Sequence, residues 1–386
     1  MSEQVLTVRR RAGANGPAFD LTFVRSGPRT ATPVLVIPGG PGLASLVPYR
    51  GLRRWAAQGG LDLLMVEHRG VGRSRHDLAG RDLPLTAMRI DLVLDDLVAV
   101  LDHERVDRAF VVGSSYGSYL AAALAARRPD RVAGLLLDSA LRSPADIEIE
   151  RRALRGLFWD GGDRLSADIR TLARRGVDER TLLDVARAAY ELGGRALVEP
   201  LVRRRAEGRS GLAWRVASAY ATRDASIARI PGVYEFDLVG AIGFRELGYG
   251  APADGGPLDP ALTYAPLADR FPAFEGAPDD FSALPAFDGP LVALAGDRDL
   301  RTPPVIAERV VASSPGGVLV RLHNGHSALD THPIALLNAV RRLVAGRHHR
   351  LPAEQDALDR LPLRGWSARL PAVLGALARI DGILPD

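Results

Sequence analysis

Four short and almost wholly apolar runs in the first 140 residues constrain the fold more than any other feature of this chain. They are "TPVLVIP", "LDLLMVEH", "RAFVVGSS" and "VAGLLLDSA". Each has the length of a buried strand, and helical periodicity between them is clearest at residues 86–105. Strands that are apolar on both faces and alternate with helices predict a mostly parallel sheet covered by helices on both sides.

The rest of the chain is organised around this α/β pattern. Residues 4–10 and 18–25 resemble half-buried strands that a turn-like segment joins as a hairpin. After residue 140 the pattern becomes helical, and strand signals resume only near residue 289. We therefore expect one α/β core, made of residues 1–140 and 286–386 with a C-terminal helical tail, and a helical cap inserted at residues 141–285.

The composition excludes several kinds of chemistry. The chain has no cysteine, which excludes disulfides, thiolate metal sites and a cysteine nucleophile. It also has no lysine, which excludes a Schiff base. The net charge of +4 is spread along the chain, and the tightest run, Arg203 to Arg205, lies beside Glu207. This pattern favours a solvated surface over a nucleic-acid site.

The termini and apolar runs also bear on location. The first residues, "MSEQVLTVRRRAG", lack the apolar centre of a signal peptide. No run reaches the roughly 18 apolar residues that a membrane span requires. We expect a cytoplasmic protein that binds neither nucleic acid nor a membrane. Whether it forms a homo-oligomer is left open by the sequence.

The segment from Gly113 to Gly117, "GSSYG", has the pattern G-x-S-x-G. It follows an apolar strand and precedes a helical stretch that stops before Pro129. In this context the pattern predicts a nucleophile elbow, with Ser115 at the tip of a sharp turn between strand and helix. The alternative is an ordinary glycine-containing connection in an α/β protein.

A nucleophilic serine needs a base, and in the elbow fold the partners follow in the order serine, acid, histidine. Asp297 and Asp299 follow one late strand, and His323 and His326 follow the next. His326 has the stronger context, because His323 would still belong to the strand. Spacing favours Asp299, which lies further along the loop. The other histidines are interpreted as surface or packing residues.

The glycine-rich "PGGPG" at residues 38–42 follows the first of the apolar runs. An acyl-transferring serine needs backbone amides aimed at the oxyanion of the tetrahedral intermediate. The predicted donors are the amides of Gly40 and Tyr116. A phosphate-binding loop is excluded, because the chain has neither dinucleotide-binding nor P-loop spacing and has no lysine.

These motifs resemble the proline iminopeptidase and tripeptidyl aminopeptidase branch of the α/β-hydrolase superfamily. Residues 38–42 are similar to its HGGPG, residues 67–74 to its D-x-R-G-x-G-x-S, and residues 113–119 to its elbow. Residues 296–303 are similar to its G-x-x-D-x-x-T-P, which independently selects Asp299 as the acid. Pro38 and Glu67 depart from the first two motifs, which weakens a transfer of peptidase specificity.

The resemblance also implies a way of holding the substrate. In iminopeptidase-like enzymes, carboxylates of the cap bind the free α-ammonium group. Glu246, in "VGAIGFRELG", is the first candidate for this anchor, and Glu235 and Asp237 are rivals. For each of them the alternative is an ordinary surface carboxylate.

The sequence thus predicts a serine hydrolase in which His326 activates Ser115 and Asp299 orients His326, with no metal or organic cofactor. The expected substrate is a small molecule or short peptide, and an aminopeptidase that releases N-terminal residues is favoured. The alternative is an esterase, amidase or thioesterase acting on a metabolite. A remote alternative is a non-catalytic binding protein on a hydrolase fold.

Overall fold

The computed structural model describes residues 3–209, 211–221, 229–364 and 369–383. Its centre is an eight-stranded sheet in the order β1-β2-β4-β3-β5-β6-β9-β10. The first two strands form the predicted antiparallel hairpin, and β2 is antiparallel to β4. The other neighbours are parallel, which confirms the mostly parallel sheet. The strands of this sheet are β1 Gln4–Arg11, β2 Ala18–Ser26, β3 Val34–Ile37, β4 Leu63–Val66, β5 Ala109–Ser114, β6 Val132–Asp138, β9 Leu291–Gly296 and β10 Val318–Leu322.

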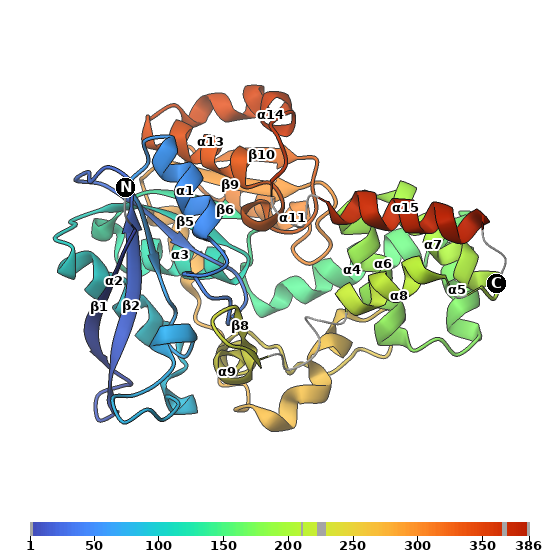
Figure 1. Ribbon diagram of the computed structural model, residues 1–386, viewed down its shortest axis with the longest axis horizontal. Coiled ribbons are helices and arrows are strands. Elements are labelled where there is room, and N and C mark those ends of the chain that lie inside the picture. Colours follow the sequence, from blue (N-terminus) through green and yellow to red (C-terminus); the bar gives the residue numbers. More distant parts are fainter. Residues whose placement is uncertain (1–2, 210, 222–228, 365–368, 384–386) are drawn as a thin grey trace.

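Helices cover both faces of the sheet (Figure 1). Within β3, Leu35 and Ile37 pack with α2, α3 and α11, whereas Val34 and Val36 pack with α1 and α13. This alternation follows from the two-residue period of a strand, so a strand covered on both sides must be apolar throughout. The helices of the core are α1 Arg50–Gln58, α2 Ile90–His103, α3 Tyr116–Arg127, α10 Asp280–Ala283, α11 Pro304–Ala312, α12 Ala328–Thr331, α13 Pro333–Val344 and α14 Leu351–Asp359.

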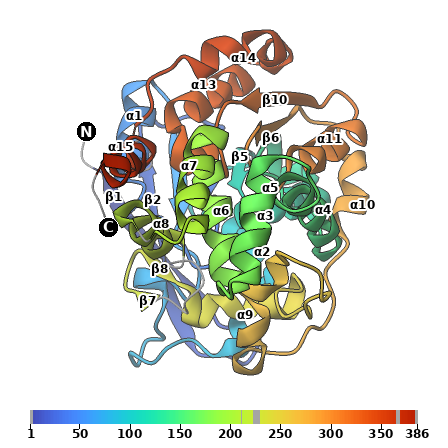
Figure 2. The ribbon, with the colours of Figure 1, turned by 90° about the vertical axis from the view of Figure 1, so that its right-hand side faces the viewer.

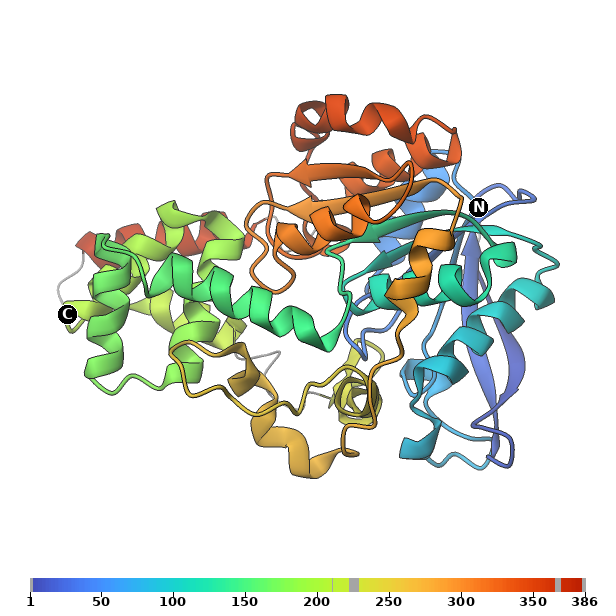
Figure 3. The ribbon, with the colours of Figure 1, turned by 180° about the vertical axis from the view of Figure 1, so that it is seen from behind.

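Much of the expected insertion, residues 141–285, forms a separate lobe with its own apolar cluster, whereas Leu238, Val239 and Ile242 pack in the core. Figure 3 shows α4 running from the core into this lobe, and Figure 2 looks onto the lobe from its outer side. Leu154, Ile169, Leu183 and Val198 belong to the cluster. The helices of the lobe are α4 Ile147–Phe158, α5 Arg164–Arg174, α6 Glu179–Gly193, α7 Arg195–Ala206 and α8 Leu212–Ala221. The later elements of the expected insertion include β7 Arg229–Ile230, β8 Tyr234–Glu235 and α9 Phe236–Glu246.

The C-terminal helix α15, Leu370–Ile383, lies against the insertion and not against the sheet (Figure 1). Its Leu374 is buried in the cluster of the insertion, and its Asp381 carboxylate accepts the amides of Leu212 and Ala213 at the start of α8. The prediction that residues 286–386 all belong to the core therefore needs correction. Helix α15 packs on the insertion because its apolar residue Leu374 is buried in the apolar cluster there.

Candidate active site

Ser115 occupies a strained turn between β5 and α3. Its φ of +52° and ψ of −121° lie in a region that non-glycine residues rarely adopt. The glycines on either side explain how the turn is accommodated. A Cβ on Gly113 would lie 2.0 Å from the Gly117 carbonyl oxygen, and one on Gly117 would lie 2.1 Å from the Ile37 carbonyl oxygen. Helix α3 can therefore approach β5 and β3 only without side chains at these two positions.

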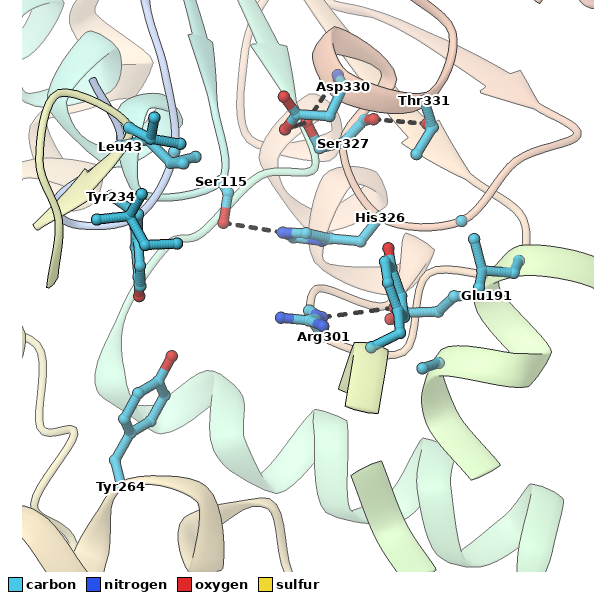
Figure 4. Close-up of a pocket in the computed structure, with 18 residues that line it drawn as sticks. Leu43, Ser115, Glu191, Tyr234, Tyr264, Arg301, His326, Ser327, Asp330 and Thr331 are labelled. Atoms are coloured by element: carbon cyan, nitrogen blue, oxygen red, sulfur yellow. Dashed lines mark hydrogen bonds and ion pairs between the residues drawn. The ribbon is translucent and has the colours of Figure 1, made fainter. Parts of the chain in front are cut away.

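The structure brings Ser115, His326 and Asp299 together in a hydrogen-bonded row (Figure 4 shows the first link). The Ser115 hydroxyl lies 2.9 Å from His326 Nε2. His326 Nδ1 lies 3.0 Å from both carboxylate oxygens of Asp299. The three residues follow β5, β9 and β10, so the carboxyl ends of three parallel strands supply them.

The surroundings lower the pKa of Asp299 and raise the pKa of His326, so both shifts favour the charged forms. Burial disfavours the charge of Asp299, but His326 and the amide and hydroxyl of Thr302 outweigh it and lower its pKa. Burial likewise disfavours the charge of His326, but the carboxylate of Asp299 outweighs it and raises the pKa above 6.5. Asp299 therefore stabilises an imidazolium that forms at His326.

The alternative acid and base lie elsewhere. Asp297 and His323 contact each other, with 2.6 Å between a carboxylate oxygen and the imidazole Nδ1, and the side chain of His323 is 76% exposed.

The loop of residues 38–42 passes over the serine. A Cβ on Gly39 would lie 3.2 Å from the Ser115 Cβ, and Gly40 borders the cavity at the serine. Tyr116 is the first residue of α3, so its amide has no acceptor within the helix. Both predicted oxyanion donors therefore belong to backbone that adjoins the Ser115 hydroxyl.

The Tyr116 side chain is buried against His68, which the sequence analysis treated as a surface or packing residue. His68 Nδ1 lies 2.6 Å from the Arg69 carbonyl, so it must carry the proton, and Nε2 accepts from the Tyr116 hydroxyl at 3.1 Å. Burial lowers the pKa of His68 to about 4, which keeps the imidazole neutral. The hydrogen bond from the Tyr116 hydroxyl to His68 thus fixes the side chain of the residue that follows Ser115.

A cavity with two lobes opens at the serine and the histidine. Figure 4 shows residues that line the larger lobe. The larger lobe has a volume of about 380 Å³ and the smaller one about 170 Å³. Gly40, Ser115, Tyr264, Arg301 and His326 border both lobes. Side chains of the insertion complete the walls, so the cavity is enclosed between the two parts of the chain.

The predicted anchors Glu246 and Glu235 do not border either lobe. Glu246 is buried and accepts the Ile90 amide at the start of α2, at 2.8 Å. Glu235 is buried against the core, where it accepts the Gly72 amide and pairs with Arg75. Both carboxylates are engaged in joining α9 to the core, and the assignment of substrate binding to them is corrected.

Glu235 instead belongs to a segment that holds the glycine loop. Its amide donates to the Gly42 carbonyl at 2.9 Å, and the Ala44 amide donates to the Val233 carbonyl at 3.0 Å. Strand β8 thus pairs with the chain that carries Gly40. Asp237, the other candidate anchor, is bound to Arg75, the arginine that also pairs with Glu235.

Other carboxylates of the insertion do border the cavity, and none of them was among the predicted anchors. Glu150 of α4 borders the smaller lobe and Glu191 of α6 the larger one. Arg187 donates to Glu150 at 3.0 Å, and Arg301 to Glu191 at 3.4 Å. Burial raises the pKa of Glu150 to about 7. Nothing in the local sequence distinguishes these glutamates, because the packing of α4 and α6 decides which face meets the cavity.

Two absences hold for the residues that the structure describes. Among them, no three histidine, aspartate or glutamate side chains are grouped so that they could hold a metal ion. None of the described helices combines the length and apolar character that crossing a bilayer requires.

Comparison with known proteins identifies relatives. Residues 32–333 match the family model described as alpha/beta hydrolase fold. A "Probable proline iminopeptidase" of Streptomyces coelicolor is 30% identical over 145 residues, which are 37% of this chain and 44% of that protein. Rhodomycin D methylesterase DauP of Streptomyces sp. strain C5 is 36% identical over 127 residues, 32% of this chain and 40% of that one.

These sequence matches span less than half the length of each curated relative. Among solved structures, the esterase RhEst1 from Rhodococcus sp. ECU1013 aligns with a TM-score of 0.50 at 17% identity. That alignment covers 89% of this chain and 99% of the other. At this identity the likeness concerns the fold alone.

Proposed function

The chain belongs to the α/β-hydrolase family, and on that basis we propose that it is a serine hydrolase whose nucleophile is Ser115. The observation that carries the proposal is the row from the Ser115 hydroxyl through His326 to Asp299, with links of 2.9 and 3.0 Å. Fold alone would not support a claim of chemistry, but this arrangement of groups does.

The proposed reaction follows from the geometry. His326 Nε2 takes the proton of Ser115 as its oxygen attacks the carbonyl carbon, and Asp299 stabilises the resulting imidazolium. The amides of Gly40 and Tyr116 donate to the oxyanion. His326 then passes its proton to the leaving group, which departs and leaves an acyl-serine. A water molecule, deprotonated by His326, hydrolyses the acyl-serine and restores the enzyme.

This reaction should respond to pH through His326. The base works only when it is neutral, so kcat/KM should rise with pH. Asp299 raises the pKa of His326, so the inflection should lie above the reference value of about 6.5. A pH–rate profile of kcat/KM measures the inflection. A profile that is flat from about pH 5 to 8, with chemistry limiting turnover, would contradict the assignment of the base.

We propose an aminopeptidase as the activity, acting on short peptides or amino-acid amides with a free N-terminus. The support is Glu150, a carboxylate that borders the smaller lobe together with Ser115. Its hydrogen bond within the described residues comes from Arg187 to Oε1. A lobe of about 170 Å³ matches a single small residue. The insertion acts as a cap that admits short chain ends and excludes folded proteins.

The test of this anchor is Glu150→Gln. We expect KM for alanine anilide with a free amino group to rise about 10- to 100-fold, because a charge-assisted hydrogen bond of about 1.5–3 kcal/mol is lost. Turnover of the acetyl-blocked anilide should change little. Glu148→Gln is the matched control, since Glu148 lies on the same helix and is exposed. Equal losses on free and blocked substrates would overturn the assignment.

The second candidate is an esterase, and a specific feature of the cavity favours it. Two of the carboxylates that border the cavity are each bound by an arginine, Glu150 by Arg187 and Glu191 by Arg301. The smaller lobe is bordered by two carboxylates, Asp146 and Glu150, and by two arginines, Arg187 and Arg301, so its charges balance and it can take an uncharged acyl ester. One of the relatives is named as a methylesterase.

Matched substrates separate the two candidates. Alanine and proline anilides, each with a free and an acetyl-blocked amino group, are compared with simple acyl esters. Cleavage of only the free-amine anilides, lost in Ser115→Ala, supports the aminopeptidase. Turnover of acyl esters that depends on Ser115, without cleavage of any anilide, supports the esterase.

A further inference from the structure

A chain of four oxygen atoms links the turn that carries Ser115 to the loop that carries His326. Ser114 Oγ lies 2.7 Å from Asp138 Oδ2 and 2.8 Å from Ser327 Oγ. Ser327 Oγ in turn lies 2.7 Å from Asp330 Oδ2. Ser114 precedes Ser115 and Ser327 follows His326, so the chain joins the immediate neighbours of both residues.

Counting protons along this chain shows that two ionised carboxylates do not fit it. Three short contacts need three protons, and the two serine hydroxyls supply only two. If both carboxylates are ionised, each serine donates to its own carboxylate. The central contact of 2.8 Å between Ser114 and Ser327 then brings two lone pairs together. One further proton completes a continuous chain of hydrogen bonds.

We propose that Asp138 holds this proton and is a positioning residue, which donates to Ser114 and thereby aligns the serine turn with the histidine loop. The inference rests on the proposed function for its catalytic meaning, although the proton itself does not depend on that function. In this arrangement Asp138 donates to Ser114, Ser114 donates to Ser327, and Ser327 donates to Asp330.

Burial decides which end of the chain carries the proton. Asp138 is 1% exposed at the end of β6, whereas Asp330 is exposed and borders the larger lobe of the cavity. Burial raises the pKa of Asp138 to about 6. The amides of Ala328 and Leu329 donate to its two oxygens, at 2.9 Å each, and moderate that shift.

Two other titratable groups, His326 and Tyr49, act on this chain of oxygen atoms. His326 acts on Asp138 by its charge and lowers the pKa of that carboxyl when it is protonated. The Tyr49 hydroxyl donates to Asp330 Oδ1 at 2.8 Å. The charge of His326 opposes a proton on Asp138, and the burial of that carboxyl outweighs it.

The proton has a consequence for stability. The folded-state pKa of Asp138 lies above the value of about 3.9 for an unfolded aspartate. Protonation therefore stabilises the folded state fully below that lower value, and this stabilisation is lost as pH rises through about 6.

The experiment compares apparent melting temperatures of wild type, Asp138→Asn and Asp330→Asn across about pH 5 to 8. An asparagine at 138 can donate to Ser114 at every pH but cannot accept from Leu329. We expect it to melt below wild type at low pH, with the gap narrowing by a few degrees as pH rises. A gap that stays constant or widens overturns the proposal. So does loss of the pH-dependent step in Asp330→Asn alone.

Carbon-13 NMR of the aspartate carboxyl groups in wild type covers the case in which the variants fail to fold. We expect one carboxyl with a midpoint near 6 whose signal also shifts in Ser114→Ala. Absence of such a titration overturns the proposal.

Steady-state kinetics test the positioning role. Asp138→Ala should lower kcat by up to about 10²-fold with little change in KM, and Asp138→Asn should recover much of the lost kcat. Equal losses in both variants would reduce Asp138 to a structural role.

The melting and NMR measurements need no substrate. If Ser115→Ala leaves turnover intact, the proposed function fails while the proton assignment can still hold. If the pH-dependent step is absent while Ser115→Ala is inactive, the proton assignment fails and the proposed function stands.

Discussion

Replacing Ser115 with alanine is expected to lower kcat by about 10⁶-fold, the loss that follows removal of the nucleophile from a serine hydrolase with its other groups intact. The reason is that the variant lacks the hydroxyl that stands 2.9 Å from His326 Nε2 at the cavity. Hydrolysis of the preferred ester or anilide, measured at saturating substrate, gives the ratio. The oxyanion amides remain in the variant, so a residual acceleration of about 10³–10⁴ over water is expected.

The variant also separates catalysis from binding. A serine-directed phosphonate should label wild type at Ser115 and leave Ser115→Ala unlabelled, with an unchanged melting temperature as evidence of folding. Ser313→Ala, in the turn that ends α11, serves as a control serine and should label as wild type does. Wild type that neither labels nor turns over any substrate would favour the non-catalytic binding protein.

Replacing Gly117 with alanine is expected to destabilise the protein by about 3 kcal/mol or more. The new Cβ would lie 2.1 Å from the Ile37 carbonyl oxygen and 2.5 Å from the Pro38 carbonyl oxygen. Both contacts are with backbone, which cannot rotate away as a side chain can, so α3 must shift from β3. Overpacking in a well-filled interior usually costs about 1–3 kcal/mol, and a forced backbone shift places this variant at the upper end or beyond. Denaturant unfolding measures the change.

Gly156→Ala is the matched control for this prediction. Gly156 lies inside α4, and a Cβ there would meet no atom within 4 Å. Alanine is favoured over glycine within a helix by about 0.5–1 kcal/mol, so this variant should be slightly more stable than wild type. An unchanged stability of Gly117→Ala would contradict the close approach of α3 and β3.

Much of the active site could be predicted because its signals are local in the sequence. The apolar strand before Gly113 and the helix after Gly117 indicated the turn, and the structure has Ser115 at a φ of +52° between them. The carboxyl ends of parallel strands share one edge of a sheet, so residues after β5, β9 and β10 were expected to meet. Ser115, Asp299 and His326 do lie within hydrogen-bonding distance.

The lining of the cavity could not be predicted in the same way. Glu246 and Glu150 are both glutamates on helices of the insertion, and nothing in the sequence ranks one above the other. The way the helices pack directs Glu246 to the start of α2 and Glu150 to the smaller lobe. The choice of Glu246 and Glu235 failed for this reason. The same holds for Leu374 of α15, whose apolar character said only that it would be buried.

By itself, the sequence determined the parallel sheet, the strained serine turn and the chain order of the three residues at its edge. Each of these depends on backbone preferences and on residues close together along the chain. Only the tertiary structure decided which carboxylates face the cavity, where the last helix packs, and that Asp138 and Asp330 are linked through two serines. These features arise where segments far apart in the sequence pack together, and the energy of such packing is not encoded in any short stretch of residues.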